Sequence, residues 1–180
     1  MVYEFLADGF EELEAFAPID ILRRAGVKVV TVGVGKREVT GSHGIPVTAD
    51  IASADIALDD SVEMIVLPGG MPGTLNLEAN DEVQRAIAYC SENGKYIAGI
   101  CAAPSILGHL GLLEGKEAIC FPGFEKDLKG AVISDKYVVD AGQIVTARGA
   151  GVCIPFALKL VEKLVNAQKA EEIRAGIQTP

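Results

Sequence analysis

Short apolar runs that alternate with helix-like segments are the feature that most limits how this chain can fold. The runs predicted as strands are Val2–Ala7, Lys28–Gly33, Met64–Leu67 and Tyr96–Ile100. The segments with helical periodicity are Glu11–Ala25, Asp81–Asn93 and Ala102–Leu113. This alternation is typical of βαβ units, in which helices cover both faces of a mostly parallel sheet. We therefore predict an α/β fold.

The second half of the chain predicts smaller additions to this sheet. Three short runs lie close together and are predicted as antiparallel strands: Val132–Ser134, Tyr137–Asp140 and Ile144–Ala147. A long amphipathic helix from Gly151 to about Val165 follows, and then a tail helix from Ala167 to about Ala175. Because no linker, repeat or low-complexity stretch interrupts the pattern, we predict a single domain over residues 1–180.

Composition and charge argue against several classes of partner. The chain has 16 basic and 25 acidic residues, a net charge of −9, which disfavours binding to nucleic acid or anionic lipid. Its first residues do not resemble a signal peptide, and its apolar runs are too short to span a bilayer. We therefore expect a cytoplasmic protein that binds neither nucleic acid nor membrane. Four dispersed cysteines without a C-x-x-C pair argue against disulfides and a zinc site. No metal or cofactor is expected.

Turn residues end the predicted strands, and they predict where the site lies. They are Asp8-Gly9, Pro68-Gly69-Gly70, Cys101 and Arg148-Gly149. In open α/β sheets, ligands bind outside the carboxyl ends of the strands. We therefore expect these four segments to converge on one site.

Cys101 is the strongest candidate nucleophile. The apolar run Tyr96–Ile100 passes into a helix with no loop residues between, which places Cys101 on a sharp turn like a nucleophile elbow. The small side chains of Ala102 and Ala103 would relieve crowding there, and Pro104 suits a first helical turn. The helix N-terminus would stabilise the thiolate by about 0.3–1 kcal/mol, which predicts a lowered thiol pKa.

The alternative is that a free cysteine simply fills space in the core, which is the commonest role of this residue. For Cys101 the two interpretations stand about even. For the other three cysteines the structural role is favoured: Cys90 on a helix, Cys120 in an apolar strand and Cys153 in the first turn of the C-terminal helix.

Four motifs, in order along the whole chain, resemble the ThiJ/PfpI superfamily and more specifically its DJ-one-like branch. They are Ala7-Asp8-Gly9-Phe10-Glu11-Glu12-Leu13-Glu14, Leu67-Pro68-Gly69-Gly70, Ala98-Gly99-Ile100-Cys101-Ala102-Ala103-Pro104 and Thr146-Ala147-Arg148-Gly149. The resemblance implies a flavodoxin-like three-layer sandwich of the class I glutamine amidotransferase type and a homodimer. It also implies that Cys101 is the nucleophile, that Glu14 touches its thiol, and that backbone N–H groups of Gly69, Gly70 and Ala102 form an oxyanion site.

Several activities accompany this resemblance. The leading expectation is a cofactor-independent glyoxalase or deglycase acting on a small carbonyl such as methylglyoxal. An oxidative-stress sensor or chaperone that uses oxidation of Cys101 is the alternative from another class. A small amidase or peptidase is a third, which is weakened because Ala102 stands where peptidase-like branches place a histidine.

Glu14 has a physical reason to be protonated. Pro18, four residues later, frees the carbonyl of Glu14 and distorts the helix, which suggests a site. An ionised carboxylate beside Cys101 would raise the thiol pKa, so a reactive thiol favours a neutral Glu14. Burial would supply this by raising the carboxyl pKa, and the acid could then move protons.

Three further residues are candidates for the pocket: His43, Phe121 and Arg148. In the family, the position of His43 often carries a basic residue that reaches toward the partner subunit, although a solvated turn residue is the favoured alternative. Phe121-Pro122 stands where relatives often carry a histidine before the proline, which predicts a more apolar pocket. Glu4, inside a predicted central strand, has no explanation from the sequence.

Overall fold

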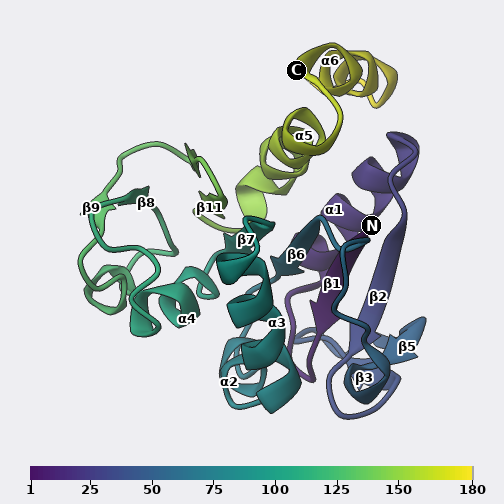
Figure 1. The fold of residues 1–180 in the computed structure, drawn as a ribbon. Coiled ribbons are helices and arrows are strands. Elements are labelled where there is room, and N and C mark those ends of the chain that lie inside the picture. Colours follow the sequence, from purple (N-terminus) through teal and green to yellow (C-terminus); the bar gives the residue numbers. More distant parts are fainter. Residues whose placement is uncertain (180) are drawn as a thin grey trace.

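A seven-stranded sheet forms the centre of the computed structural model, which describes residues 1–179 (Figure 1). The strand order is β10-β11-β7-β6-β1-β2-β5. These strands are β1 (Val2–Leu6), β2 (Val29–Gly33), β5 (Ile51–Ala52), β6 (Met64–Leu67), β7 (Tyr96–Ile100), β10 (Val138–Ala141) and β11 (Ile144–Ala147). All neighbours pair in parallel except β10, which is antiparallel to β11. Pro180, which the single-domain prediction includes, lies outside the described residues.

Helices cover both faces of this sheet (Figure 1). One layer contains α2 (Gly73–Glu78), α3 (Asp81–Glu92) and α4 (Pro104–His109), and the other contains α1 (Glu12–Arg24), α5 (Cys153–Leu164) and α6 (Ala167–Gly176). Strand side chains alternate between the layers: Phe5 and Ile65 face α3, whereas Val2 and Val66 face α1 and α5. The order β2-β1-β6-β7-β11 is the flavodoxin order, so the predicted α/β sandwich is confirmed. Among the described residues, no helix is both long and apolar enough to cross a bilayer.

Several short elements were not predicted. They are the antiparallel hairpin β3 (Glu38–Thr40) and β4 (Pro46–Thr48), the strand β8 (Glu117–Ala118), β5, α2, and three 3-10 turns at Ser53–Asp55, Glu125–Asp127 and Ala150–Val152. Each is too short for apolar periodicity to distinguish it from a loop. The strand β9 (Val132–Ile133) is not among them, because it lies within the predicted run Val132–Ser134.

Two predicted helices have different bounds. The segment Ala102–Leu113 was predicted as one helix, but α4 ends at His109, because Gly111 takes a left-handed φ of 73° that ends the helix. The C-terminal helix starts at Cys153 instead of Gly151, after a 3-10 turn.

The predicted antiparallel additions are partly wrong. β9 pairs in parallel with β8, because the intervening chain crosses back through the Glu125–Asp127 turn instead of closing a hairpin. β11 is antiparallel to β10 but also extends the parallel sheet beside β7. Cys120 lies just beyond β8 rather than in a strand.

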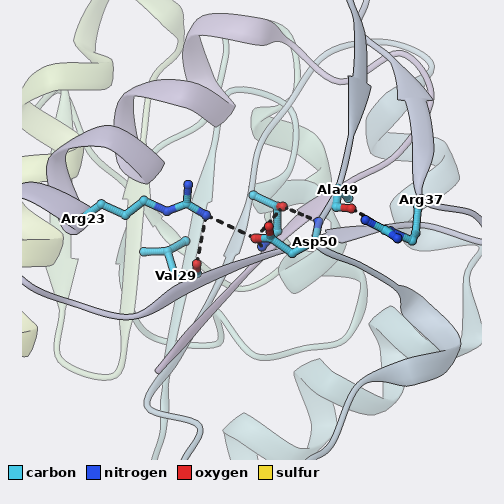
Figure 2. Close-up of polar contacts among 6 residues, drawn as sticks. Arg23, Val29, Arg37, Ala49 and Asp50 are labelled. Atoms are coloured by element: carbon cyan, nitrogen blue, oxygen red, sulfur yellow. Dashed lines mark hydrogen bonds and ion pairs between the residues drawn. The ribbon is translucent and has the colours of Figure 1, made fainter.

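A polar network holds the end of α1 against the sheet edge (Figure 2). The Nη2 atom of Arg23 donates to the Val29 carbonyl at 3.1 Å and to Oδ2 of Asp50 at 3.2 Å. Nearby, Nε of Arg37 donates to the Ala49 carbonyl at 2.9 Å, which joins the two ends of the β3–β4 hairpin (Figure 2). These contacts orient α1, the helix that carries the predicted acid.

Candidate active site

Cys101 lies on a strained turn between β7 and α4. Its φ is 63°, in the left-handed region, which costs a residue with a side chain about 1–3 kcal/mol. Two backbone hydrogen bonds hold the turn. The Cys101 N–H donates to the Ala147 carbonyl at 2.9 Å, and the Cys101 carbonyl accepts from the Phe121 N–H at 2.8 Å. The sharp strand-to-helix turn predicted for Cys101 is therefore present.

Glu14, in the first turn of α1, meets the thiol of Cys101. Its side chain is buried, and its Oε2 atom accepts a hydrogen bond from the Gly69 N–H at 2.9 Å, which holds the carboxyl beside the Cys101 side chain. The Ala150 backbone contributes another hydrogen bond. Burial raises the pKa of Glu14 from its ordinary 4.5 to about 7 and outweighs these hydrogen bonds, which lower it. A carboxyl group in this position holds its proton up to neutral pH.

The thiol of Cys101 does not have the lowered pKa that the helix N-terminus predicted. Burial, and then the negative charge of Glu14, raise the pKa of Cys101 to about 12, against the opposing effect of the Ala102 and Gly70 N–H groups. The prediction is therefore wrong for the pair in which Glu14 is ionised. If the thiol proton moves to Glu14, the like charge disappears and the neutral acid can donate a hydrogen bond to the thiolate. The nucleophilic form is thus a thiolate beside a neutral acid.

Two glycines after β6 allow this close packing. A Cβ atom on Gly69 would lie 2.6 Å from Cβ of Cys101 and 2.7 Å from Oε2 of Glu14, so no side chain fits there. The backbone N–H groups of Gly70 and Ala102 lie near the sulfur and lower the thiol pKa, so they could stabilise a negative charge there. Gly69 was predicted to share that task, but its N–H is used to hold Glu14.

A cavity of about 350 Å³ adjoins this pair. Its lining consists of Phe121, Pro122, Tyr137, Arg148 and the segment Gly149–Val152. A Cβ on Gly149 would lie 3.2 Å from Cδ2 of Phe121 and 3.8 Å from Oε1 of Glu14, so this part of the lining lies next to the acid. The structure therefore places Phe121 and Arg148 at the predicted pocket. Tyr137 was missed, although its place just before the strand that pairs antiparallel with β11, which ends one residue before Arg148, could have indicated it.

His43 does not join this cavity. It lies on the β3–β4 turn, with its backbone N–H 2.8 Å from Oε1 of Glu12 and its Nδ1 2.7 Å from Oε2. The hydrogen bond to Glu12, and then its charge, raise the pKa of His43. With Glu11, these residues bring one ligand atom each within 4.8 Å, a spacing that a cation could bridge, although Glu12 and His43 already satisfy each other.

The remaining groups do not line the cavity. Cys90, Cys120 and Cys153 are buried, as expected for structural cysteines. His109, at the end of α4, pairs with a glutamate of α2 at 2.6 Å. Glu4 is completely buried, with no hydrogen-bond partner among the described residues, and burial raises its carboxyl pKa well above the ordinary value.

Comparison with known proteins gives a consistent result. The sequence model of the DJ-1/PfpI family matches residues 1–163. Protein dj-1beta of Drosophila melanogaster is 35% identical over 175 residues, which cover 96% of this chain and 93% of that protein. A deglycase of Thermococcus kodakarensis is 32% identical over 147 residues, 81% of this chain and 87% of the deglycase. The solved structure described as Toxoplasma gondii DJ-1, oxidized, superposes with a TM-score of 0.93 at 34% identity and covers 98% of this chain and 97% of its own.

Proposed function

Because this chain belongs to the DJ-1/PfpI family, we propose that it is a cofactor-independent enzyme in which Cys101 attacks small reactive carbonyl compounds such as methylglyoxal. The observation that carries this proposal is the close pair of Cys101 and buried Glu14, with two backbone N–H groups near the sulfur. A relative named a deglycase supports chemistry of the same class. The four free cysteines suit a reducing compartment, and we place the activity in the cytoplasm.

The first step forms a hemithioacetal. The Cys101 thiolate adds to the aldehyde carbon, and the π electrons of the carbonyl move to its oxygen. The N–H groups of Gly70 and Ala102 stabilise this oxyanion, and the neutral carboxyl of Glu14 then protonates it. Glu14 is left as a carboxylate and can act as a base.

The second step moves a hydrogen between the two carbons. The Glu14 carboxylate removes the proton from the former aldehyde carbon, giving an enediolate, and returns it to the neighbouring carbon, while the hydroxyl proton of the first carbon passes to the oxygen of the second. The product is a thioester of lactate on Cys101. One water molecule hydrolyses it, releasing lactate and restoring the thiol, so the net reaction is the addition of one water to methylglyoxal.

Two substitutions test these roles. We expect Cys101→Ser to form no lactate from methylglyoxal. Glu14→Gln should still be alkylated at Cys101 by iodoacetamide but should lose lactate formation by at least about 100-fold, because it cannot transfer protons. Cys90→Ala, which removes a buried thiol on the opposite helical layer, is the control and should keep the activity. Unchanged lactate formation in Glu14→Gln would refute the proton-transfer role.

A second candidate function is oxidative-stress sensing or chaperone action through oxidation of Cys101. It is favoured by the partial exposure of this thiol and by the Gly70 and Ala102 N–H groups, which could bind sulfinate oxygens. Two molecules of peroxide would convert the thiol to sulfinate and be reduced to water. Selective oxidation of Cys101 at low peroxide without lactate formation would favour this function. An amidase or peptidase is less favoured, because His43 and His109 both pair with glutamates away from Cys101.

We also propose that the protein forms a homodimer through the start of α1. Leu13 and Phe16 on α1 and Ile45 on the β3–β4 turn are 63%, 37% and 50% exposed. The turn is held against α1 by the bonds between His43 and Glu12. Apolar side chains gathered on one surface are typical of protein interfaces.

A further inference from the structure

The cavity beside the Cys101–Glu14 pair is larger and more apolar than methylglyoxal requires. From it we infer that the preferred substrate is an α-oxoaldehyde bearing an aromatic ring, which binds against Phe121 and Tyr137. This inference rests on the proposed carbonyl chemistry and names the class of substrate that the same site would take.

Two sets of distances place the aromatic ring of Phe121 near the reacting atoms. Phe121 donates its N–H to the Cys101 carbonyl at 2.8 Å, so its ring begins next to the elbow. A Cβ atom placed on Gly149 would lie 3.2 Å from Cδ2 of Phe121 and 3.8 Å from Oε1 of Glu14. In the proposed complex, a substrate whose carbonyl lies at Cys101 would place its substituent against the Phe121 ring.

The remaining lining suits a flat apolar group. The Arg148 guanidinium lies 5.6 Å from the centre of the Tyr137 ring, so two planar faces border the cavity. Pro122 and Val152 add apolar surface, and Arg148 carries the only charge among the lining residues. Phe121 and Tyr137 are 48% and 62% exposed, so an aromatic substituent would cover apolar surface that faces solvent. Aromatic rings and guanidinium groups favour such stacking.

The volume of the cavity agrees with a substrate that bears an aromatic ring. About 350 Å³ lies within the range of pockets that enclose ring-bearing ligands, roughly 300–1,000 Å³. A methyl substituent would leave most of this space to water, whereas a phenyl ring would displace it. An added apolar group in a fitted pocket improves kcat/KM by about tenfold or more.

The kinetic experiment compares phenylglyoxal with methylglyoxal, using initial rates because phenylglyoxal also modifies arginine slowly. We expect kcat/KM to be at least about tenfold higher for phenylglyoxal. Phe121→Ala and Tyr137→Ala should each reduce this ratio, whereas Val165→Ala, which removes an exposed apolar side chain at the end of α5, should keep it. A ratio near one in the unmodified protein would overturn the inference while leaving the proposed reaction intact.

A binding experiment separates the pocket from the reaction. Mandelate and lactate, the hydroxy acids formed from the two aldehydes, are titrated into Cys101→Ser by calorimetry. Binding of mandelate at least about tenfold tighter than lactate, lost in Cys101→Ser combined with Phe121→Ala, would support the aromatic pocket even if neither aldehyde is turned over. Equal binding of the two acids would overturn it.

Discussion

Replacing Glu14 by glutamine should make the protein more stable at alkaline pH. Burial raises the Glu14 pKa from 4.5 to about 7 in the folded protein. Between these values the unfolded chain has lost the proton and the folded protein still holds it, so the stability of the unmodified protein falls as pH rises. At about 1.4 kcal/mol per pH unit, the total loss is about 3 kcal/mol. An amide at this position has no proton to lose.

Urea unfolding at two pH values measures this difference. The isoelectric point is about 4.7, so the lower pH is set at about 5.5, where the protein carries a net negative charge. From there to pH 8.5, the advantage of Glu14→Gln over the unmodified protein should grow by about 2 kcal/mol, the part of the loss that lies above pH 5.5. The raised pKa of Glu4 affects both proteins equally and cancels in the comparison.

Glu38→Gln is the matched control, because it removes the same charge from an exposed position on β3. Its free energy of unfolding, relative to the unmodified protein, should change little between the two pH values. If the difference in free energy of unfolding between Glu14→Gln and the unmodified protein were the same at both pH values, Glu14 would ionise in the folded protein as readily as in the unfolded chain. The buried neutral acid on which the proposed mechanism depends would then be refuted.

Three other substitutions test separate parts of the molecule. Gly69→Ala should lower the free energy of unfolding by about 1–3 kcal/mol in urea titrations, because its Cβ would lie 2.6 Å from Cβ of Cys101; an unchanged value would show that the elbow can shift. Glu4→Leu should raise that free energy by roughly 1–3 kcal/mol at neutral pH, because it removes a buried carboxyl group without a described partner, and destabilisation would indicate that a partner exists. Leu13→Glu should convert the proposed dimer to a monomer in sedimentation experiments, and a dimer of unchanged affinity would exclude the α1 surface.

Much of the fold follows from patterns that span many residues. The long strands and helices have strong periodicity, and parallel strands bring their carboxyl ends to one edge whatever loops join them. This is why Asp8-Gly9, Pro68-Gly69-Gly70 and Cys101 could be placed together from the sequence, whereas the contact of Glu14 with the thiol was implied by the family resemblance. The short β3–β4 hairpin and the parallel pairing of β9 depend on contacts between distant segments, which local patterns do not encode.

The electrostatics of the site could not be predicted as well as its residues. The helix N-terminus at Cys101 was visible in the sequence, and it favours a lowered thiol pKa. The depth of burial and the close contact with Glu14 act in the opposite direction, and both are properties of the packed structure. Tyr137 was missed although the antiparallel pairing of β10 with β11, which brings it beside Arg148, was predicted.

The elbow at residue 101 is held by its backbone, so the position of the reacting group does not depend on which side chain carries out the reaction. The hydrogen bonds at residue 101 join its backbone to Ala147 and Phe121, and its thiol takes no part in them. Any side chain placed there would therefore be presented at the same point, above the same N–H groups and beside the same acid. Substitutions of lining residues such as Phe121 or Tyr137 could therefore change the reaction or its substrate while the position of attack stays constant.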